Sequence, residues 1–249
     1  APSALKHLIA IYQHERDWDK AIDHARRLQQ ATGESQGATI AQFYCELAEQ
    51  SRTRGALDEA RRHIEEAYAA ESDCVRASMI KGHVEAADGH LDRAIASFEQ
   101  VAEQDVDYVP EILSPLLDCY ARAGQMARAE EFLLNITETY QGVSPVLALA
   151  RLYTRTQGED AAVAFLNRAL RQRPSVRALM ALIDVNLHTA SGEARDNFLI
   201  LRDLTRKLVE GQAMYRCNKC GFGAKAHHWQ CPSCKNWGTV RPIHGVVGE

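Results

Sequence analysis

A motif of seven residues recurs through the first two thirds of the chain at an interval close to 34 residues. Its clearest forms are RDWDKAI at 16–22, GALDEAR at 55–61, GHLDRAI at 89–95 and GQMARAE at 124–130, with a looser copy, GEDAAVA, at 158–164. A unit of this size cannot bury its apolar face alone, so neighbouring units must stack. One alanine in each copy is spaced from the next by 39, 34, 35 and 33 residues: Ala21, Ala60, Ala94, Ala129 and Ala162.

The residues around each motif predict a pair of helices joined by a tight turn. Apolar residues recur at helical spacing before the motif, as in Leu113, Leu116 and Tyr120, and after it, as in Leu133 and Ile136. This pattern is typical of tetratricopeptide repeats, so we expect a mostly α fold and a right-handed α-solenoid. A helical bundle without repeats is the alternative, but it would not require five copies in phase. The turns themselves are expected at three glycines, Gly55, Gly89 and Gly124.

Three domains follow from this pattern. Residues 1–174 hold five tetratricopeptide-like repeats, and Pro174 stands where the last repeat should end, because proline cannot continue a helix. We predict that one further helical pair, at residues 175–211, caps the array. Residues 212–249 form a separate metal-binding domain. The longer spacing between the first two repeats indicates an extended loop within 31–40.

The last domain is predicted to bind a metal through four cysteines that form two Cys-x2-Cys pairs. Thiolates are soft ligands, and two such turns bring four sulfurs to a tetrahedron around zinc or iron. Two disulfides are the alternative. The isolated Cys45, Cys74 and Cys119 indicate a reducing compartment and are expected to be small core residues. We expect His227 and His228 to lie on a loop surface, and the metal ligands to be Cys217, Cys220, Cys231 and Cys234.

A domain of fewer than 40 residues cannot supply its own core, so the metal and surrounding aromatic residues must do so. Trp229 and Trp237 are large apolar surfaces, and the linker after Gly211 is short. We therefore expect both tryptophans to dock the metal domain on the final helical pair. The expected receivers are Phe198, Leu201, Leu204 and Leu208.

Charge and motifs restrict the function. The net charge is −4 and the pI is near 6.2, which argues against a dedicated nucleic-acid binder, although residues 213–249 carry +4. A zinc ribbon that touches nucleic acid is therefore a weak option. We find no HExxH motif, nucleophile elbow or phosphate loop, so we predict a protein without enzymatic activity. Because the sequence does not begin with methionine, we interpret it as a fragment whose preceding residues are outside it.

A partner-binding surface is expected on the concave side of the array. In tetratricopeptide proteins the first helix of each pair lines that side, which usually contacts protein partners. By resemblance to that repeat family, we predict that partners bind through Arg52, Arg76, His83, Arg151 and Arg177.

The stretches YRCNKCGF at 215–222 and WQCPSCKNWGTVRPIHG at 229–245 resemble a rubredoxin-type metal domain. Their union with upstream tetratricopeptide repeats resembles the lipopolysaccharide assembly protein B (LapB/YciM) family over essentially the whole chain. The resemblance implies one iron or zinc ion on the four cysteines. It also implies an N-terminal transmembrane helix, absent here, that anchors the protein to the inner membrane with the repeats on the cytoplasmic side.

The same resemblance implies a non-enzymatic adaptor that regulates lipopolysaccharide biosynthesis. The expected partners are proteins: the membrane protease FtsH, the lipid A deacetylase LpxC, whose proteolysis the family promotes, and lipopolysaccharide assembly proteins. A rubredoxin-like protein for electron transfer or redox sensing is the alternative. A reversible redox couple linked to a partner reductase would favour that alternative.

Overall fold

The computed structural model describes residues 2–249, which form two compact units. The first unit contains the described residues up to Asp105 together with Pro115–Gly124, and the second contains Val106–Ser114 and Gln125–Glu249. Helix α7 (Val109–Arg122) contributes residues to both units.

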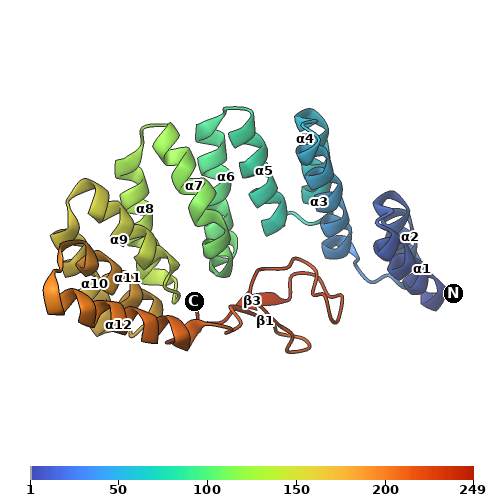
Figure 1. Ribbon diagram of the computed structural model, residues 1–249. Helices are drawn as coiled ribbons and strands as arrows, with labels where there is room; N and C mark the ends of the chain where they lie inside the picture. Colours follow the sequence, from blue (N-terminus) through green and yellow to red (C-terminus); the bar gives the residue numbers. More distant parts are fainter. Residues whose placement is uncertain (1) are drawn as a thin grey trace. The chain divides into compact units, whose positions relative to one another are not determined.

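The first unit consists of helices that pair in chain order, each pair forming a hairpin (Figure 1). The second helices of these pairs bury one stripe and leave the opposite stripe in solvent, as expected for amphipathic helices of a repeat array. The pairs are α1 (Pro2–Glu15) with α2 (Trp18–Thr32), α3 (Gly37–Thr53) with α4 (Leu57–Ala70), and α5 (Val75–Ala87) with α6 (Leu91–Gln104).

The second unit continues with helices that pack on their chain neighbours and ends in a small ribbon (Figure 1). It begins with the short 3-10 helix η1 (Val106–Tyr108) and the first residues of α7. The other helices are α8 (Met126–Thr139), α9 (Ser144–Thr156), α10 (Glu159–Gln172), α11 (Val176–Thr189) and α12 (Gly192–Val209). The strands are β1 (Tyr215–Cys217), β2 (Gly223–Ala224) and β3 (Val240–Pro242).

The repeat pattern correctly located the core of the helical pairs. All five motif alanines are fully buried, at 0% exposure, which lets the two helices of a pair approach closely. Phe98 and Tyr120 are fully buried as well. The predicted fold class, mostly α with tandem tetratricopeptide-type helical pairs and a C-terminal cysteine ribbon, is confirmed. The domain boundaries at 174 and 211 stay a prediction.

The predicted turns lie between helices, and one of them uses an unexpected residue. Gly55, Gly89 and Gly124 adopt positive φ angles of 77°, 80° and 71°. In the first repeat Arg16 stands where the later copies have glycine, and it also adopts a positive φ, of 58°. A side chain disfavours this backbone region, so Arg16 carries local strain that glycine would avoid.

The extended loop predicted between the first two repeats is wrong. Helix α2 continues to Thr32, Gly33 ends it with a φ of 72°, and α3 already begins at Gly37. The extra residues lengthen α3, which has 17 residues whereas α4 has 14. The physical reason is that the stretch after Gly37 is rich in good helix formers, which the helix absorbs. Within residues 2–249 the structure has no helix with the length and apolar character needed to cross a bilayer.

Candidate metal centre

The ribbon is a three-stranded antiparallel sheet that places the first pair of cysteines at a strand end. Its strand order is β2-β1-β3, with Tyr215 opposite Ala224 on one side and opposite Pro242 on the other. Cys217 is the last residue of β1 and pairs with Val240 of β3. The sheet therefore holds the first cysteine against the strand that follows the second cysteine pair.

Both cysteine pairs fold into the same turn. The amide of Gly221 donates to the carbonyl of Cys217 at 2.9 Å, and the amide of Lys235 donates to the carbonyl of Cys231 at 3.0 Å. Gly221 and Lys235 follow the second cysteine of their turns and adopt φ angles of 79° and 60°. The first turn thus has glycine in the left-handed position, and the second turn has a lysine there.

The four sulfur atoms are placed as a tetrahedral thiolate site requires. The Sγ atoms of Cys217 and Cys234 lie 3.7 Å apart, as do those of Cys220 and Cys231, and all four lie within 4.8 Å of one another. Zinc–sulfur bonds of about 2.3 Å imply a tetrahedron with edges of about 3.8 Å. The residues therefore fit a tetrathiolate metal ion, and at these distances the sulfurs are not joined as two disulfides.

Hydrogen-bonding groups surround the sulfurs. Cys217 Sγ and the Thr239 hydroxyl form a hydrogen bond 3.3 Å long, and the amide of Lys219 donates to the same sulfur at 3.4 Å. The hydrogen bond with Thr239 is the main cause that lowers the pKa of Cys217 to about 6. The Asn236 side chain donates to Cys234 Sγ at 3.2 Å and lowers the pKa of that thiol, so the site is prepared for an ion that needs thiolates.

The site is partly shielded from solvent. Cys217 and Cys231 are buried, Cys234 is half-buried and Cys220 is exposed. Burial raises the pKa of Cys231 to about 11 in the absence of an ion, so binding a metal must displace its proton. Four protein ligands complete a tetrahedron and leave no position for water or substrate, which is typical of structural rather than hydrolytic sites.

The ribbon contacts the helical part of its own unit through an aromatic cluster. Trp229 stacks on Tyr108 of η1 with ring centroids 4.9 Å apart and an angle of 11° between the rings. The Arg241 guanidinium lies 4.9 Å from the centre of the Tyr108 ring, and His227 meets that ring edge-on at 5.3 Å. Tyr108 is buried in this cluster, so a residue between two repeats anchors the metal ribbon.

Polar contacts surround the aromatic cluster. The Tyr215 hydroxyl donates to Glu111 at the start of α7, and His244 Nε2 lies 3.2 Å from Asp107 Oδ1. Burial raises the pKa of Glu111, and burial together with Glu111 raises the pKa of Tyr215. These polar groups are paired across the contact, which fixes the orientation of the ribbon against η1 and the start of α7.

The segment after β3 completes the starts of two helices. The carbonyl of Val246 accepts a hydrogen bond from the amide of Val176, the first residue of α11, at 2.8 Å. The Glu249 carboxylate accepts from the amide of Ser144, the first residue of α9, at 2.9 Å. The first amides of a helix have no partner within it, and the helix dipole favours a negative group there. Residues 243–249 therefore act as caps supplied from outside both helices.

The prediction that the final helical pair receives Trp229 is wrong. Leu201, Leu204 and Leu208 of α12 are 47%, 54% and 57% exposed, while Trp229 stacks on Tyr108. The available signal was Tyr108 itself, an aromatic residue between two repeats that the repeat pattern does not use. For Trp237, which is half-buried beside Gln230, the docking role stays a prediction.

The other cysteine and histidine predictions have mixed outcomes. Cys45, Cys74 and Cys119 are buried in helical cores, as expected for small apolar residues. His228 is exposed, but His227 is half-buried among the rings of Tyr108, Tyr215 and Trp229, so its assignment to a loop surface is wrong. The reason is that its loop lies against η1.

The predicted partner residues occupy different environments, and their role is a proposal. In the first unit Arg52 forms a two-bond pair with Glu49, and Arg76 is only 6% exposed because its guanidinium bonds Glu46 at 2.7 Å. His83 packs edge-on against Phe98, and burial lowers its pKa. In the second unit Arg151 is exposed, whereas Arg177 donates to the Met214 sulfur. Arg151 is thus the most accessible of the five.

Comparison with known proteins agrees with this geometry. Residues 215–242 match a family described as a rubredoxin metal binding domain of the LapB zinc-ribbon type. In solved structures, BtubC from P. vanneervenii matches with a TM-score of 0.53 at 17% identity, covering 84% of this chain and 93% of that one, a likeness of fold alone.

Relatives with similar sequences extend the match beyond the ribbon. The chain is 37% identical to lipopolysaccharide assembly protein B of Escherichia coli K12 over 98% of its own length, and 30% identical to that of Haemophilus influenzae Rd, again over 98%. It spans 63% and 61% of the length of these two relatives. Over the region that it covers, the chain is therefore similar to lipopolysaccharide assembly protein B along nearly its whole length.

Proposed function

We propose that this chain is the partner-binding part of a non-enzymatic adaptor that regulates lipopolysaccharide biosynthesis. The observation that carries the proposal is the union of tetratricopeptide-type pairs with a closed four-thiolate ribbon, in a chain 37% identical to a lipopolysaccharide assembly protein. Stacked helical pairs offer broad surfaces for proteins, and four thiolates leave no open coordination position for hydrolytic chemistry.

The metal has a structural role in this proposal. Cys217, Cys220, Cys231 and Cys234 hold one zinc or iron ion, which when bound supplies folding free energy to a ribbon with few buried residues. The folded ribbon then orients Trp229 on Tyr108 and holds residues 243–249 against the starts of α9 and α11. The ion therefore acts through the shape that it stabilises.

At a finer level, we assign the adaptor to FtsH-dependent proteolysis of LpxC. An N-terminal helix outside this chain would anchor the protein to the inner membrane, with the helical pairs on the cytoplasmic side. Partner contacts are assigned to the first helices of the pairs, and Arg151 is the accessible residue there that is best suited to test the idea.

The test is LpxC turnover by FtsH in membranes that contain the full-length protein. We expect turnover to require the intact ribbon and to proceed equally with zinc-loaded and iron-loaded protein. Arg151→Glu should slow turnover without changing helix content, and Arg171→Glu at an exposed position of α10, the second helix of that pair, is the matched control. Turnover with iron alone that also varies with iron valence would instead favour redox sensing.

A further inference from the structure

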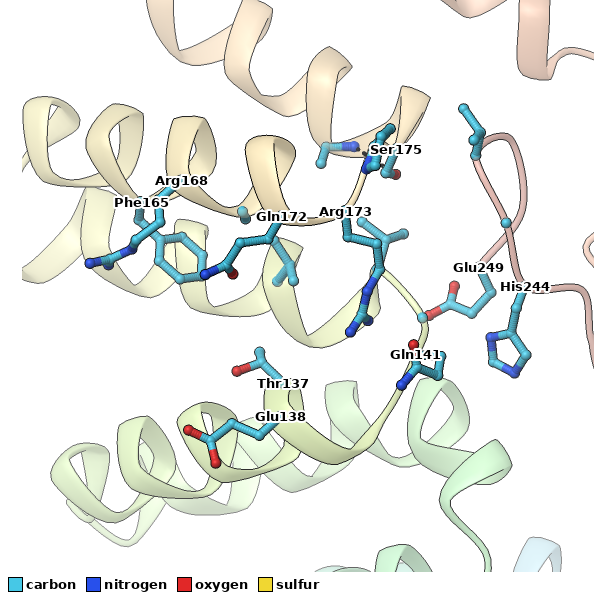
Figure 2. A pocket seen from close by; sticks show the side chains of 18 of the residues that line it. Thr137, Glu138, Gln141, Phe165, Arg168, Gln172, Arg173, Ser175, His244 and Glu249 are labelled. Carbon is cyan, nitrogen blue, oxygen red and sulfur yellow. Dashed lines mark hydrogen bonds between the residues drawn. The ribbon is translucent and has the colours of Figure 1, made fainter.

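A cavity of about 900 Å³ lies in the second unit, where the chain turns from α8 to α9 and from α10 to α11 (Figure 2). Its volume is within the range of about 300–1,000 Å³ that is common for ligand pockets. One wall is formed by α8 and α10, and another by residues 244–249 of the segment that follows the ribbon. Nothing in the metal site or in the predicted concave surface uses this cavity.

The cavity combines an apolar lining with polar groups that suit a peptide. Leu134 and Val246 line it and are exposed to solvent, and Phe165 also lines it. Gln141 and Gln172 add carboxamides, each of which can both donate and accept a hydrogen bond. A peptide group offers the same combination of one donor and one acceptor.

Three charged groups of the cavity form no ion pair among the described residues: Arg168, Arg173 and Glu138. The Arg168 guanidinium lies 6.0 Å from the centre of the Phe165 ring, and the Glu249 carboxylate is already bonded to the amide of Ser144. Arg173 donates one hydrogen bond to the carbonyl of Tyr140 at 3.0 Å, which leaves the rest of its guanidinium fork for another acceptor. Because Glu138 opposes the arginines, the cavity suits a ligand of mixed charge better than an anionic amphiphile.

We propose that this cavity binds a short extended segment of a partner polypeptide that carries an aliphatic side chain next to a carboxylate. The aliphatic side chain packs on Leu134 and Phe165, the carboxylate pairs with Arg173, and the glutamine carboxamides bond the peptide backbone. The proposal rests on the adaptor function and adds a specific recognition site to it.

The metal ribbon controls whether the cavity is complete. Residues 244–249 form a wall only while Val246 bonds Val176 and Glu249 bonds Ser144, and this segment directly follows β3 of the ribbon. A ribbon that unfolds on metal loss releases that wall. Gly248→Ala provides a test that leaves the cysteines unchanged, because a Cβ at this position would collide with the carbonyl of Ile243.

Random dodecapeptides displayed on phage, selected against the metal-loaded chain, test the proposal. The most enriched peptide is then synthesised with a fluorophore and its affinity is measured by anisotropy. We expect enriched peptides to share an aliphatic residue beside Asp or Glu. Arg173→Ala and Leu134→Ser should each weaken binding about tenfold or more, and Gly248→Ala and metal removal should weaken it similarly. Arg171→Ala, an exposed neighbour outside the cavity, should change it less than about twofold.

The proposal is overturned if no peptide is enriched, or if the enriched peptides bind Arg173→Ala and Leu134→Ser as tightly as the unchanged chain. Dodecyl phosphate that binds with the same dependence on these residues, in place of peptides, would also overturn it. Because the assay uses the purified chain, its outcome is independent of LpxC turnover. Normal LpxC turnover with Arg173→Ala would show that the adaptor works without this cavity. If the chain does not support LpxC turnover at all, the purified chain should still bind the selected peptides.

Discussion

The helical pairs and the metal ribbon are stabilised by different means. One core cluster of the first unit contains ten buried residues, among them Ala60, Ile64 and Val84, and nine of the ten are supplied by α3, α4 and α5. The ribbon cluster contains three buried residues, and two of these, Cys217 and Cys231, belong to the four-cysteine cluster. Repeated apolar contacts are enough to fold the first region, whereas we propose that the second depends on a metal ion and on a surface more than 100 residues away in sequence.

The largest effect should come from removing one metal ligand. Cys231→Ser should abolish metal binding, which contributes on the order of 10 kcal/mol to folding in small thiolate sites, and so unfold the ribbon. In a Trp18→Phe background only Trp229 and Trp237 remain, so their fluorescence should shift to that of solvent-exposed tryptophan while far-UV circular dichroism keeps the helical signal. Cys119→Ala, a buried cysteine in α7, should retain the metal. If the helical signal is lost when the ribbon unfolds, the helical pairs also depend on the metal for folding, which contradicts the difference between the two regions.

A smaller effect is expected within the helical pairs, from a buried charge. Arg76→Ala leaves Glu46 without its partner, and we expect a loss of about 3 kcal/mol in the free energy of unfolding of the first unit. Arg151→Ala, at an exposed position, should change the free energy of unfolding by less than about 0.5 kcal/mol. Urea titration measures both. If both variants lose the same free energy of unfolding, the ion pair between Arg76 and Glu46 does not stabilise the first unit.

The contact between ribbon and helices can be weakened without touching the metal. Trp229→Ala removes the ring that stacks on Tyr108, and we expect a cost of about 2 kcal/mol from lost apolar contact and ring stacking. The metal should stay bound, but the ribbon amides should exchange hydrogen faster. His228→Ala changes an exposed neighbour and serves as the control. If the ribbon amides of Trp229→Ala exchange at the rate of the unchanged chain, contacts other than the Trp229 ring hold the ribbon on the helices.

The smallest effects concern one strained residue in each region. Arg16 and Lys235 have positive φ angles of 58° and 60°, at places where equivalent turns use glycine. Arg16→Gly and Lys235→Gly should each raise stability by up to about 1 kcal/mol, because glycine relieves the left-handed strain. Arg16→Gly should raise the denaturant midpoint at which the helices unfold. Lys235→Gly should raise the midpoint at which the ribbon releases its metal. A lower midpoint in either variant would show that its side chain makes contacts worth more than the strain.

The sequence predicted the local features of both regions well. The repeat period located the buried alanines, and the cysteine spacing located four sulfurs that the structure gathers within 4.8 Å. Both predictions rest on interactions between residues that are near one another in sequence, where helix and turn geometry fix the distances.

Features that depend on distant contacts could not be read in the same way. The docking of Trp229 on Tyr108 and the capping of α9 by Glu249 join residues separated by more than 100 positions. The exposed leucines of α12 looked equally suitable as a receiver, because a pattern of apolar residues does not state which surface will cover them. Only the three-dimensional arrangement distinguishes these choices.

We propose that a bound metal stabilises the ribbon and thereby holds residues 243–249 at the starts of helices α9 and α11. Amide hydrogen exchange of the full chain, followed by NMR at Ser144 and Val176 with and without a chelator, tests it most directly. We predict that both amides exchange slowly in the metal-loaded chain and at least about tenfold faster after metal removal, while amides within α3–α6 keep their protection. Persistent protection of Ser144 and Val176 in the metal-free chain would contradict the claim.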